Sequence, residues 1–243
     1  LGKGSFGQVY LGVSPTQKRA FKFIDATSEA RPRLEQELAV HQKLEHPHIV
    51  RCYGGGFHQN YFYLELELID SKSTLRDFIQ PGGRPGPEVL RHLIPLMEAL
   101  EYMHGQDAIH RDLKPENVMA TSAGVLKLTD FGYAKQIQAN ITASHEAFGT
   151  PSYMAPEQGI QSNRVTPAAD EYSLGVMIYE LLCGHPPFEG DFIEVLMAHR
   201  DESPPPLSGA LWPVLEKMLA KRPEERFGSI AAAREALLMG LTS

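Results

Sequence analysis

The chain has 243 residues, enough to bury a core in one large domain or in two lobes. A formal net charge of −7 argues against nucleic acid as the main partner, since no basic excess is available to displace counterions. Two cysteines exclude a disulfide framework and indicate a reducing, cytoplasmic setting. No apolar run approaches roughly eighteen residues, so we expect neither a membrane span nor a signal peptide. Because the chain begins inside a motif, at Leu1, we expect a domain of a longer protein, in which another segment could provide a membrane tether.

The first eleven residues carry glycines at 2, 4 and 7, flanked by residues that favour strands. No helical pattern follows Gly7, so Gly2, Gly4 and Gly7 predict a strand-turn-strand flap instead of the strand-to-helix turn of a dinucleotide fold. Glycine lets a backbone lie close over phosphate groups. Val9 would then press on a purine ring.

Residues 18–24 alternate and predict another strand, which contains Lys22. A lysine in a strand usually faces solvent, but a helix with an inward carboxylate after it makes Lys22 a candidate phosphate ligand. Leucines at helical spacing predict such a helix over residues 31–44. Glu35 and Glu37 both lie on it, and spacing alone does not choose between them.

The remaining patterns place strands early in the chain and helices late. Residues 49–56 and 60–69 predict a strand pair, with a connector at its end, and residues 88–104 predict a long amphipathic helix. Further helices are expected over residues 173–183 and 231–238. This order predicts an α+β bilobal domain. Its parts would be a β-rich N-lobe with one main helix (1–66), a hinge (67–72) and a larger helical C-lobe (73–243).

Residues 109–117 read Ile-His-Arg-Asp-Leu-Lys-Pro-Glu-Asn, a loop that can point three polar side chains into one cleft. Phosphoryl transfer needs a carboxylate to orient a hydroxyl, cations on the phosphates and oxygen ligands for Mg²⁺. Asp112, Lys114 and Asn117 match these needs. Asp130, in the Asp-Phe-Gly that ends a predicted strand, would add the second metal ligand. Alone, such a trio more commonly stabilises a turn or caps a helix, so the functional interpretation depends on the other motifs.

Together, these motifs resemble eukaryotic-type (Hanks-type) Ser/Thr protein kinases over essentially the whole chain, bacterial ones in particular. The resemblance implies a kinase fold that binds ATP with Mg²⁺, or with Mn²⁺ as the alternative metal, and acts on protein Ser and Thr hydroxyls. Leu66 matches the residue before the hinge. The implied ATP-binding residues are Leu1, Gly2, Gly4, Gly7, Val9, Ala20, Lys22, Glu67, Leu68 and Met119.

The resemblance also implies the catalytic roles. Asp112 would be the catalytic base and Lys114 its phosphate-binding companion, while Asn117 and Asp130 would be Mg²⁺ ligands. Lys22 would bind the α- and β-phosphates with Glu37 as its helix partner, because Glu37 precedes the Leu-x-His-Pro-x-Ile-Val pattern at the family's interval.

Two structural features are implied as well. Asp170 would be a buried anchor of the catalytic loop, and Glu157 would form an ion pair with Arg226. His41 departs from the family, which places an apolar residue there in a packing column through Phe131 and His110. It is either a tolerated core residue or a cause of looser Lys22–Glu37 assembly.

Regulation by phosphate is implied by Arg111, which precedes the catalytic Asp. Thr142 and Ser144 lie at the spacing from Thr150 at which bacterial relatives place activating sites, and Lys135 would be a second phosphate ligand. The alternative is that both are ordinary polar loop residues. We expect two copies of the chain to phosphorylate each other.

Two further residues near the segment's end have implied roles. Thr150 would hydrogen-bond the Asp112–Lys114 pair. Glu146 stands where many animal kinases carry a phosphothreonine, and we expect its carboxylate to pair with Arg111 without modification.

Two other functions compete with protein phosphorylation: a pseudokinase that binds nucleotide without transfer, and a small-molecule kinase of related fold. Lys22, Asp112, Asn117 and Asp130 are all present, which argues against the first. The Ala-Pro-Glu segment is typical of a shelf for a polypeptide and argues against the second. Glu116 would either favour a basic residue near the acceptor or be a helix-cap contact. We expect neither membrane nor nucleic acid among the partners of this domain.

Overall fold

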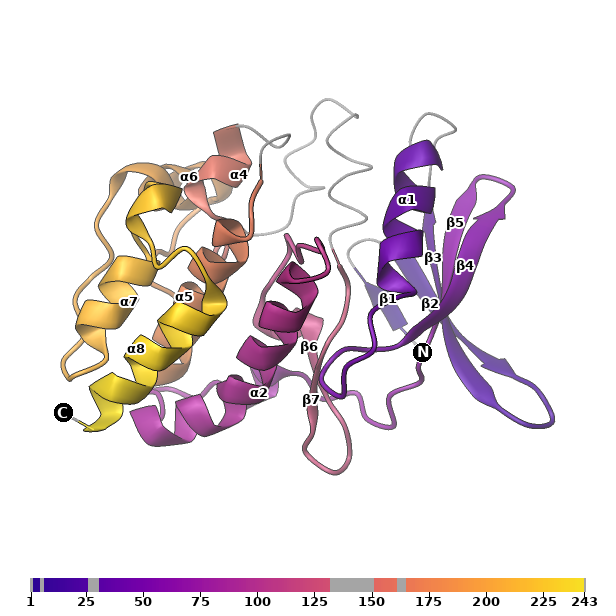
Figure 1. Ribbon diagram of the computed structural model, residues 1–243, viewed down its shortest axis with the longest axis horizontal. Helices are drawn as coiled ribbons and strands as arrows, with labels where there is room; N and C mark the ends of the chain where they lie inside the picture. Colours follow the sequence, from indigo (N-terminus) through magenta and orange to yellow (C-terminus); the bar gives the residue numbers. More distant parts are fainter. Residues whose placement is uncertain (1, 5–6, 26–30, 132–150, 161–164, 243) are drawn as a thin grey trace.

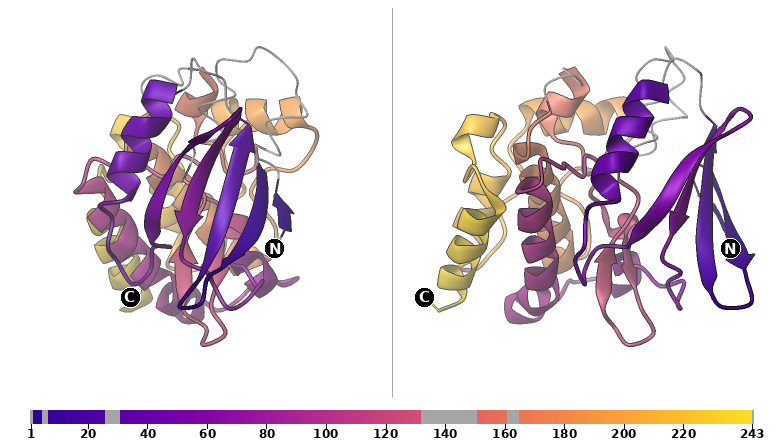
Figure 2. Two further views of the ribbon diagram at one scale, coloured as in Figure 1. Left: turned by 90° about the vertical axis from the view of Figure 1, so that its right-hand side faces the viewer. Right: turned by 45° about the vertical axis from the view of Figure 1, so that its right-hand side comes forward.

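The computed structural model describes residues 2–4, 7–25, 31–131, 151–160 and 165–242. A β-sheet lobe and a helical lobe lie side by side, with α1 (Arg31–His41) alongside the sheet (Figure 1, Figure 2). The sheet is antiparallel, with strand order β1-β2-β3-β5-β4. Its strands are β1 (Gly2–Gly4), β2 (Gly7–Val13), β3 (Lys18–Asp25), β4 (Cys52–His58) and β5 (Tyr61–Leu66). The α+β bilobal prediction is therefore confirmed.

Alternation along β3 explains how the sheet builds its core. Ala20, Lys22 and Ile24 are buried, while the residues between them are half-buried, as expected where one face of a strand is covered. Leu34 and Leu38 of α1 pack into the same cluster of buried side chains. A Cβ on Gly55 of β4 would lie 2.5 Å from the Tyr63 carbonyl oxygen and 3.2 Å from Leu38, so glycine lets the helix approach the sheet.

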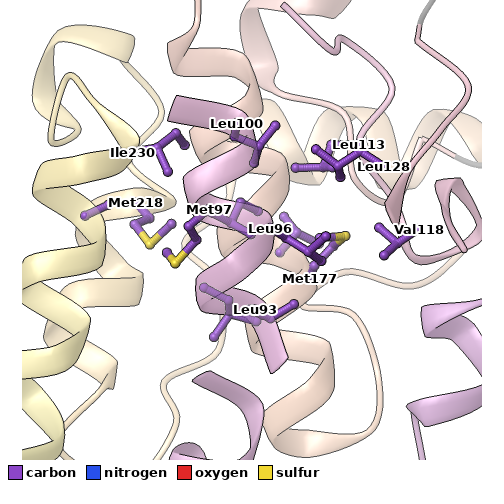
Figure 3. Close-up of a cluster of buried hydrophobic side chains, with 14 of the residues drawn as sticks. Leu93, Leu96, Met97, Leu100, Leu113, Val118, Leu128, Met177, Met218 and Ile230 are labelled. Atoms are coloured by element: carbon purple, nitrogen blue, oxygen red, sulfur yellow. The ribbon is translucent and has the colours of Figure 1, made fainter. Parts of the chain in front are cut away.

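The helical lobe is centred on α2 (Gly86–His104) and α5 (Ala168–Cys183). Apolar residues of α2 at helical spacing face Met177 of α5, Met218 and Ile230 (Figure 3). The two-stranded sheet of β6 (Val118–Ala120) and β7 (Leu126–Leu128) closes this core towards the other lobe. The remaining elements are η2 (Leu75–Phe78), η3 (Pro115–Asn117), α4 (Pro156–Ile160), α6 (Phe192–Asp201), α7 (Trp212–Met218), η6 (Pro223–Glu225) and α8 (Ile230–Thr242).

The lobes are joined by backbone pairing as well as by the chain. Val50 N–H donates to the Leu128 carbonyl at 2.9 Å, and Leu128 N–H donates to the His48 carbonyl at 2.8 Å. Lys127 of β7 also binds the Glu67 carboxylate, 2.8 Å from Nζ to Oε1. The segment between α1 and β4 is therefore fixed against β7 of the helical lobe.

Several element boundaries differ from the predictions. The helix predicted over residues 31–44 ends at His41, because the chain turns there and the Leu44 N–H donates to the His41 carbonyl. The long helix begins at Gly86, two residues early, and the helix predicted over 173–183 begins at Ala168. Within the described part of the chain, no helix is long and apolar enough to cross a membrane.

Candidate active site

Asp170 of α5 anchors the loop that carries the predicted catalytic residues. Its carboxylate accepts the backbone N–H groups of His110 and Arg111, each at 2.8 Å, and lies 2.8 Å from His104 Nε2. Burial alone would raise the pKa of Asp170, but these hydrogen bonds and the neighbouring histidines hold the pKa below its usual value. The predicted anchor is confirmed, whereas the contribution of His104 was missed, because an isolated histidine near a helix end carries no signal.

The anchor holds Arg111 in a left-handed backbone conformation, with φ of 64°. Such a conformation is costly for a residue other than glycine and persists only where its surroundings determine it. Here Asp170 takes the Arg111 N–H, and Gln158 Nε2 donates to the Arg111 carbonyl at 2.8 Å. The backbone N–H and carbonyl groups of Arg111 are thus fixed by α5 and α4, which orients the next residue, Asp112.

Asp112, Lys114 and Asn117 converge as the sequence predicted. Lys114 Nζ lies 3.3 Å from Asp112 Oδ2, and Asn117 Nδ2 donates to both the Asp112 carbonyl and its carboxylate, at 2.7 and 2.8 Å. Because its amide nitrogen has two acceptors, Asn117 keeps its side-chain oxygen as the atom that can bind a metal. The trio places a carboxylate, an ammonium group and an amide oxygen within one loop.

Lys22 and Glu37 have partners that differ from the expected ones. Lys22 Nζ lies 2.7 Å from Asp130 Oδ1, and Glu37 Oε1 lies 3.4 Å from Arg111 Nη1. The expected Lys22–Glu37 ion pair is not among the ion pairs that the structure gives for its described residues. A buried ammonium group needs a counter-charge, and Asp130, in a left-handed conformation with φ of 59°, supplies it.

A column of rings connects α1 with the catalytic loop. The ring centroids of His41 and Phe131 are 4.2 Å apart, and those of Phe131 and His110 are 5.1 Å apart. Burial lowers the pKa of His41 to about 3 and also lowers that of His110, so both are neutral near pH 7. His41 therefore packs where the family has an apolar residue, with Nε2 3.4 Å from the Val50 carbonyl.

Four of the predicted adenine-contacting residues pack in one hydrophobic cluster of the sheet lobe. Ala20 and Leu66 are buried opposite one another on β3 and β5, and Val9 and Leu68 pack against the same cluster. Met119 lies on β6 opposite Lys127 of β7, and the Glu67 side chain is held by Lys127.

The structure explains why one of the three glycines of the predicted flap, Gly7, must be glycine. A Cβ on Gly7, where φ is 154°, would collide with the Phe23 carbonyl oxygen of β3, so only glycine fits between the paired strands. Gly2 and Gly4 lie on β1, with Gly2 opposite Val9. Leu1 and the predicted regulatory residues Lys135, Thr142, Ser144, Glu146 and Thr150 lie outside the described residues.

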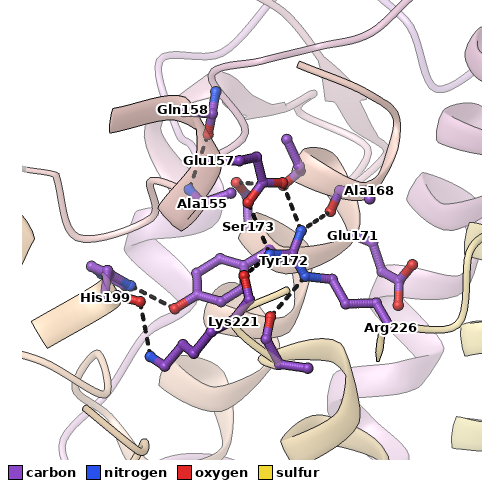
Figure 4. A network of polar contacts seen from close by, with 12 residues as sticks. Ala155, Glu157, Gln158, Ala168, Glu171, Tyr172, Ser173, His199, Lys221 and Arg226 are labelled. Carbon is purple, nitrogen blue, oxygen red and sulfur yellow. Dashed lines mark hydrogen bonds and ion pairs between the residues drawn. The ribbon is translucent and has the colours of Figure 1, made fainter. Parts of the chain in front are cut away.

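A second polar network supports the segment from 151 to 158 (Figure 4). Arg226 binds Glu157 through both terminal guanidinium nitrogens, at 2.7 and 2.9 Å, and donates to the Ala168 carbonyl, which confirms the predicted ion pair. His199 of α6 connects the Tyr172 hydroxyl with the Ser152 carbonyl, at 2.8 and 2.9 Å. Patterns in the sequence did not indicate the His199 contacts.

Comparison with known proteins agrees with this geometry. The family described as protein kinase domain matches residues 1–238. The chain is 34% identical over 249 aligned residues to the serine/threonine-protein kinase PknF of Mycobacterium tuberculosis, which covers 93% of this chain and 52% of that protein. It is 35% identical to Pkn1 of Myxococcus xanthus (99% of this chain, 37% of that protein) and 33% identical to PknB of Mycobacterium leprae (98% and 41%). The chain thus spans about half the length, or less, of these relatives. Its match over nearly all residues shows that the chain belongs to the protein kinase domain family.

Proposed function

We propose that this chain transfers the γ-phosphoryl group of Mg·ATP to Ser and Thr hydroxyls of protein substrates. Members of the protein kinase family use ATP with a divalent metal ion. The observation that carries the proposal is the convergence of Lys114 and Asn117 on the Asp112 carboxylate. The relatives are named serine/threonine-protein kinases, which supports the choice of acceptor.

In this proposal Asp112 orients the acceptor hydroxyl and accepts its proton, while Lys114 neutralises charge on the transferring group. Asn117 Oδ1 and the Asp130 carboxylate suit Mg²⁺, which prefers hard oxygen ligands and commonly takes only one or two from protein beside phosphate oxygens and water. That preference agrees with the described residues, in which no cluster of three or more His, Cys, Asp or Glu could hold a metal. When bound, the metal would neutralise charge on the phosphates.

We further propose that Lys22 and Glu37 pair during the catalytic cycle. A shift of α1 would be needed for that step, because Glu37 lies against Arg111 and Lys22 against Asp130. Freed from Glu37, Arg111 would be available to a phosphate on Thr142 or Ser144, with Lys135 as a second ligand, or to the carboxylate of Glu146. Thr150 would then hydrogen-bond the Asp112–Lys114 pair.

The test is the intact mass of the chain after incubation with Mg·ATP, with and without a generic protein substrate. We expect mass gains of about 80 Da per phosphoryl group, on the chain at Thr142 or Ser144 and on the substrate, because a phosphate adds to a hydroxyl. Asp112→Asn should abolish these gains while ATP binding persists, since the role of Asp112 is realised in the transition state.

The matched control is Asp201→Asn, which removes an exposed carboxylate at the end of α6, where it pairs with Arg200. This variant should phosphorylate normally. Nucleotide binding by the wild type with no transfer to itself or to any substrate would refute the proposal and favour a pseudokinase.

A further inference from the structure

Arg76 lies beside the catalytic loop although it belongs to the segment that follows the hinge. The backbone there runs along β6, since Thr74 and Met119 form an isolated antiparallel bridge and Ala120 N–H donates to the Ser73 carbonyl at 2.9 Å. Arg76 is on η2, the short helix that begins at Leu75. Its guanidinium group is consequently directed to the acidic residues around the loop.

Two carboxylates and one hydroxyl surround this guanidinium group. Arg76 Nε lies 2.8 Å from Glu116 Oε1 and Nη1 lies 2.5 Å from Glu180 Oε1, while Nη2 donates to the Tyr153 hydroxyl. The Tyr153 hydroxyl donates in turn to Glu180. The Glu180 side chain is 4% exposed, so its charge needs a counter-charge, whereas those of Arg76 and Glu116 are 37% and 47% exposed.

This cluster adjoins the place where an acceptor hydroxyl would meet Asp112. Tyr153 lines a small cavity together with Asp112 and Lys114. Glu116 follows Lys114 by two residues on η3, so its carboxylate and the proposed phosphate ligand belong to one loop. Side chains that flank the acceptor in a bound polypeptide would therefore pass near Glu116.

We propose that Arg76 is a specificity-determining residue, which supplies from within the chain the cation that Glu116 and Glu180 would otherwise take from a basic residue of the substrate. The inference rests on the proposed phosphoryl transfer to proteins. The sequence left open whether Glu116 favours a basic residue near the acceptor or makes a helix-cap contact. In the structure the Glu116 carboxylate binds Arg76 of the chain itself. Wild-type protein consequently phosphorylates Ser and Thr without requiring a neighbouring Arg or Lys.

The experiment compares peptides that carry one Ser in an alanine background, with Arg or Ala at each neighbouring position in turn. We expect wild type to differ by less than about threefold in kcat/KM between the Arg and Ala peptides. Arg76→Gln, which removes the positive charge between Glu116 and Glu180, should prefer Arg at one position by about tenfold or more, as expected for a regained charged hydrogen bond. The double variant Arg76→Gln/Glu116→Gln should lose most of that preference.

Peptide binding measured by fluorescence anisotropy gives the same comparison without catalysis, and thermal unfolding establishes that each variant is folded. A tenfold preference of wild type for an Arg peptide would overturn the inference. So would a folded Arg76→Gln variant whose ratio of kcat/KM between the Arg and Ala peptides equals that of wild type. Failure of wild type to phosphorylate any peptide or protein would instead refute the proposed function, and the binding ratios would still decide the role of Arg76.

Discussion

Replacing Asp170 by Asn tests whether one buried carboxylate positions the catalytic loop. The amide has one oxygen where the carboxylate has two, so one of the backbone N–H groups of His110 and Arg111 would face an NH₂ donor. An unsatisfied buried donor costs about 1–3 kcal/mol, and each remaining hydrogen bond to a charged acceptor becomes a weaker neutral one. We expect Asp170→Asn to lower the free energy of unfolding by about 3 kcal/mol.

The same change should reduce kcat more than it weakens nucleotide binding. Arg111 would no longer be fixed in its left-handed conformation, and a displacement of about 1 Å in a catalytic group can lower the rate by about a hundredfold. Urea unfolding, hydrogen exchange at the amides of His110 and Arg111, and steady-state kinetics measure these effects separately. We expect faster exchange at both amides and a kcat lowered by about tenfold to a hundredfold.

The matched control is Glu171→Gln, the adjacent residue on α5, which is equally buried but accepts the Phe227 N–H at 2.9 Å. It should leave exchange at the amides of His110 and Arg111 unchanged. If Asp170→Asn retained wild-type kcat and amide protection, the reasoning on the anchor would be refuted.

Other predictions concern stability. Burial lowers the pKa of His41 to about 3 and that of His199 to about 4, so the unfolded chain binds more protons below pH 6.5 and stability should fall on acidification, by about 2 kcal/mol per histidine at pH 5. Urea unfolding across pH measures this, and His199→Gln should reduce the slope; an unchanged slope would contradict the assignment. Arg226→Lys keeps the charge but loses the two-nitrogen contact with Glu157, and unfolding should become easier by about 2–4 kcal/mol; a loss below about 0.5 kcal/mol would show that the contact contributes little. Gly55→Ala places a Cβ 2.5 Å from the Tyr63 carbonyl oxygen and 3.2 Å from Leu38 and should cost about 1–3 kcal/mol, whereas a thermal midpoint equal to wild type would show that β4 and α1 both shift to accommodate it.

Local patterns were sufficient for much of the fold and for the centre of the candidate site. Asp112, Lys114 and Asn117 lie within six residues of one another, so the loop itself brings them together. Amphipathic spacing located α2, and alternation located β3, because both depend on which face of an element is buried. Helix ends were predicted less well, since the end of α1 at His41 depends on how the chain packs afterwards.

Partners of charged residues were decided by the tertiary structure. Glu35 and Glu37 were both candidates for Lys22, yet Lys22 lies against Asp130 and Glu37 against Arg111. Several carboxylates compete for each cation, and small shifts between the lobes change which of them comes within contact distance.

The sequence by itself determined the protein kinase family, the α+β architecture and the identity of the residues in the catalytic loop, because each depends on short-range patterns. Only the tertiary structure brought Arg76 to Glu116, 40 residues away, and to Glu180, 104 residues away. Contacts at such separations depend on how α5 and η2 pack against the loop. Which basic group neutralises the acidic residues beside the acceptor site is therefore a property of the folded chain.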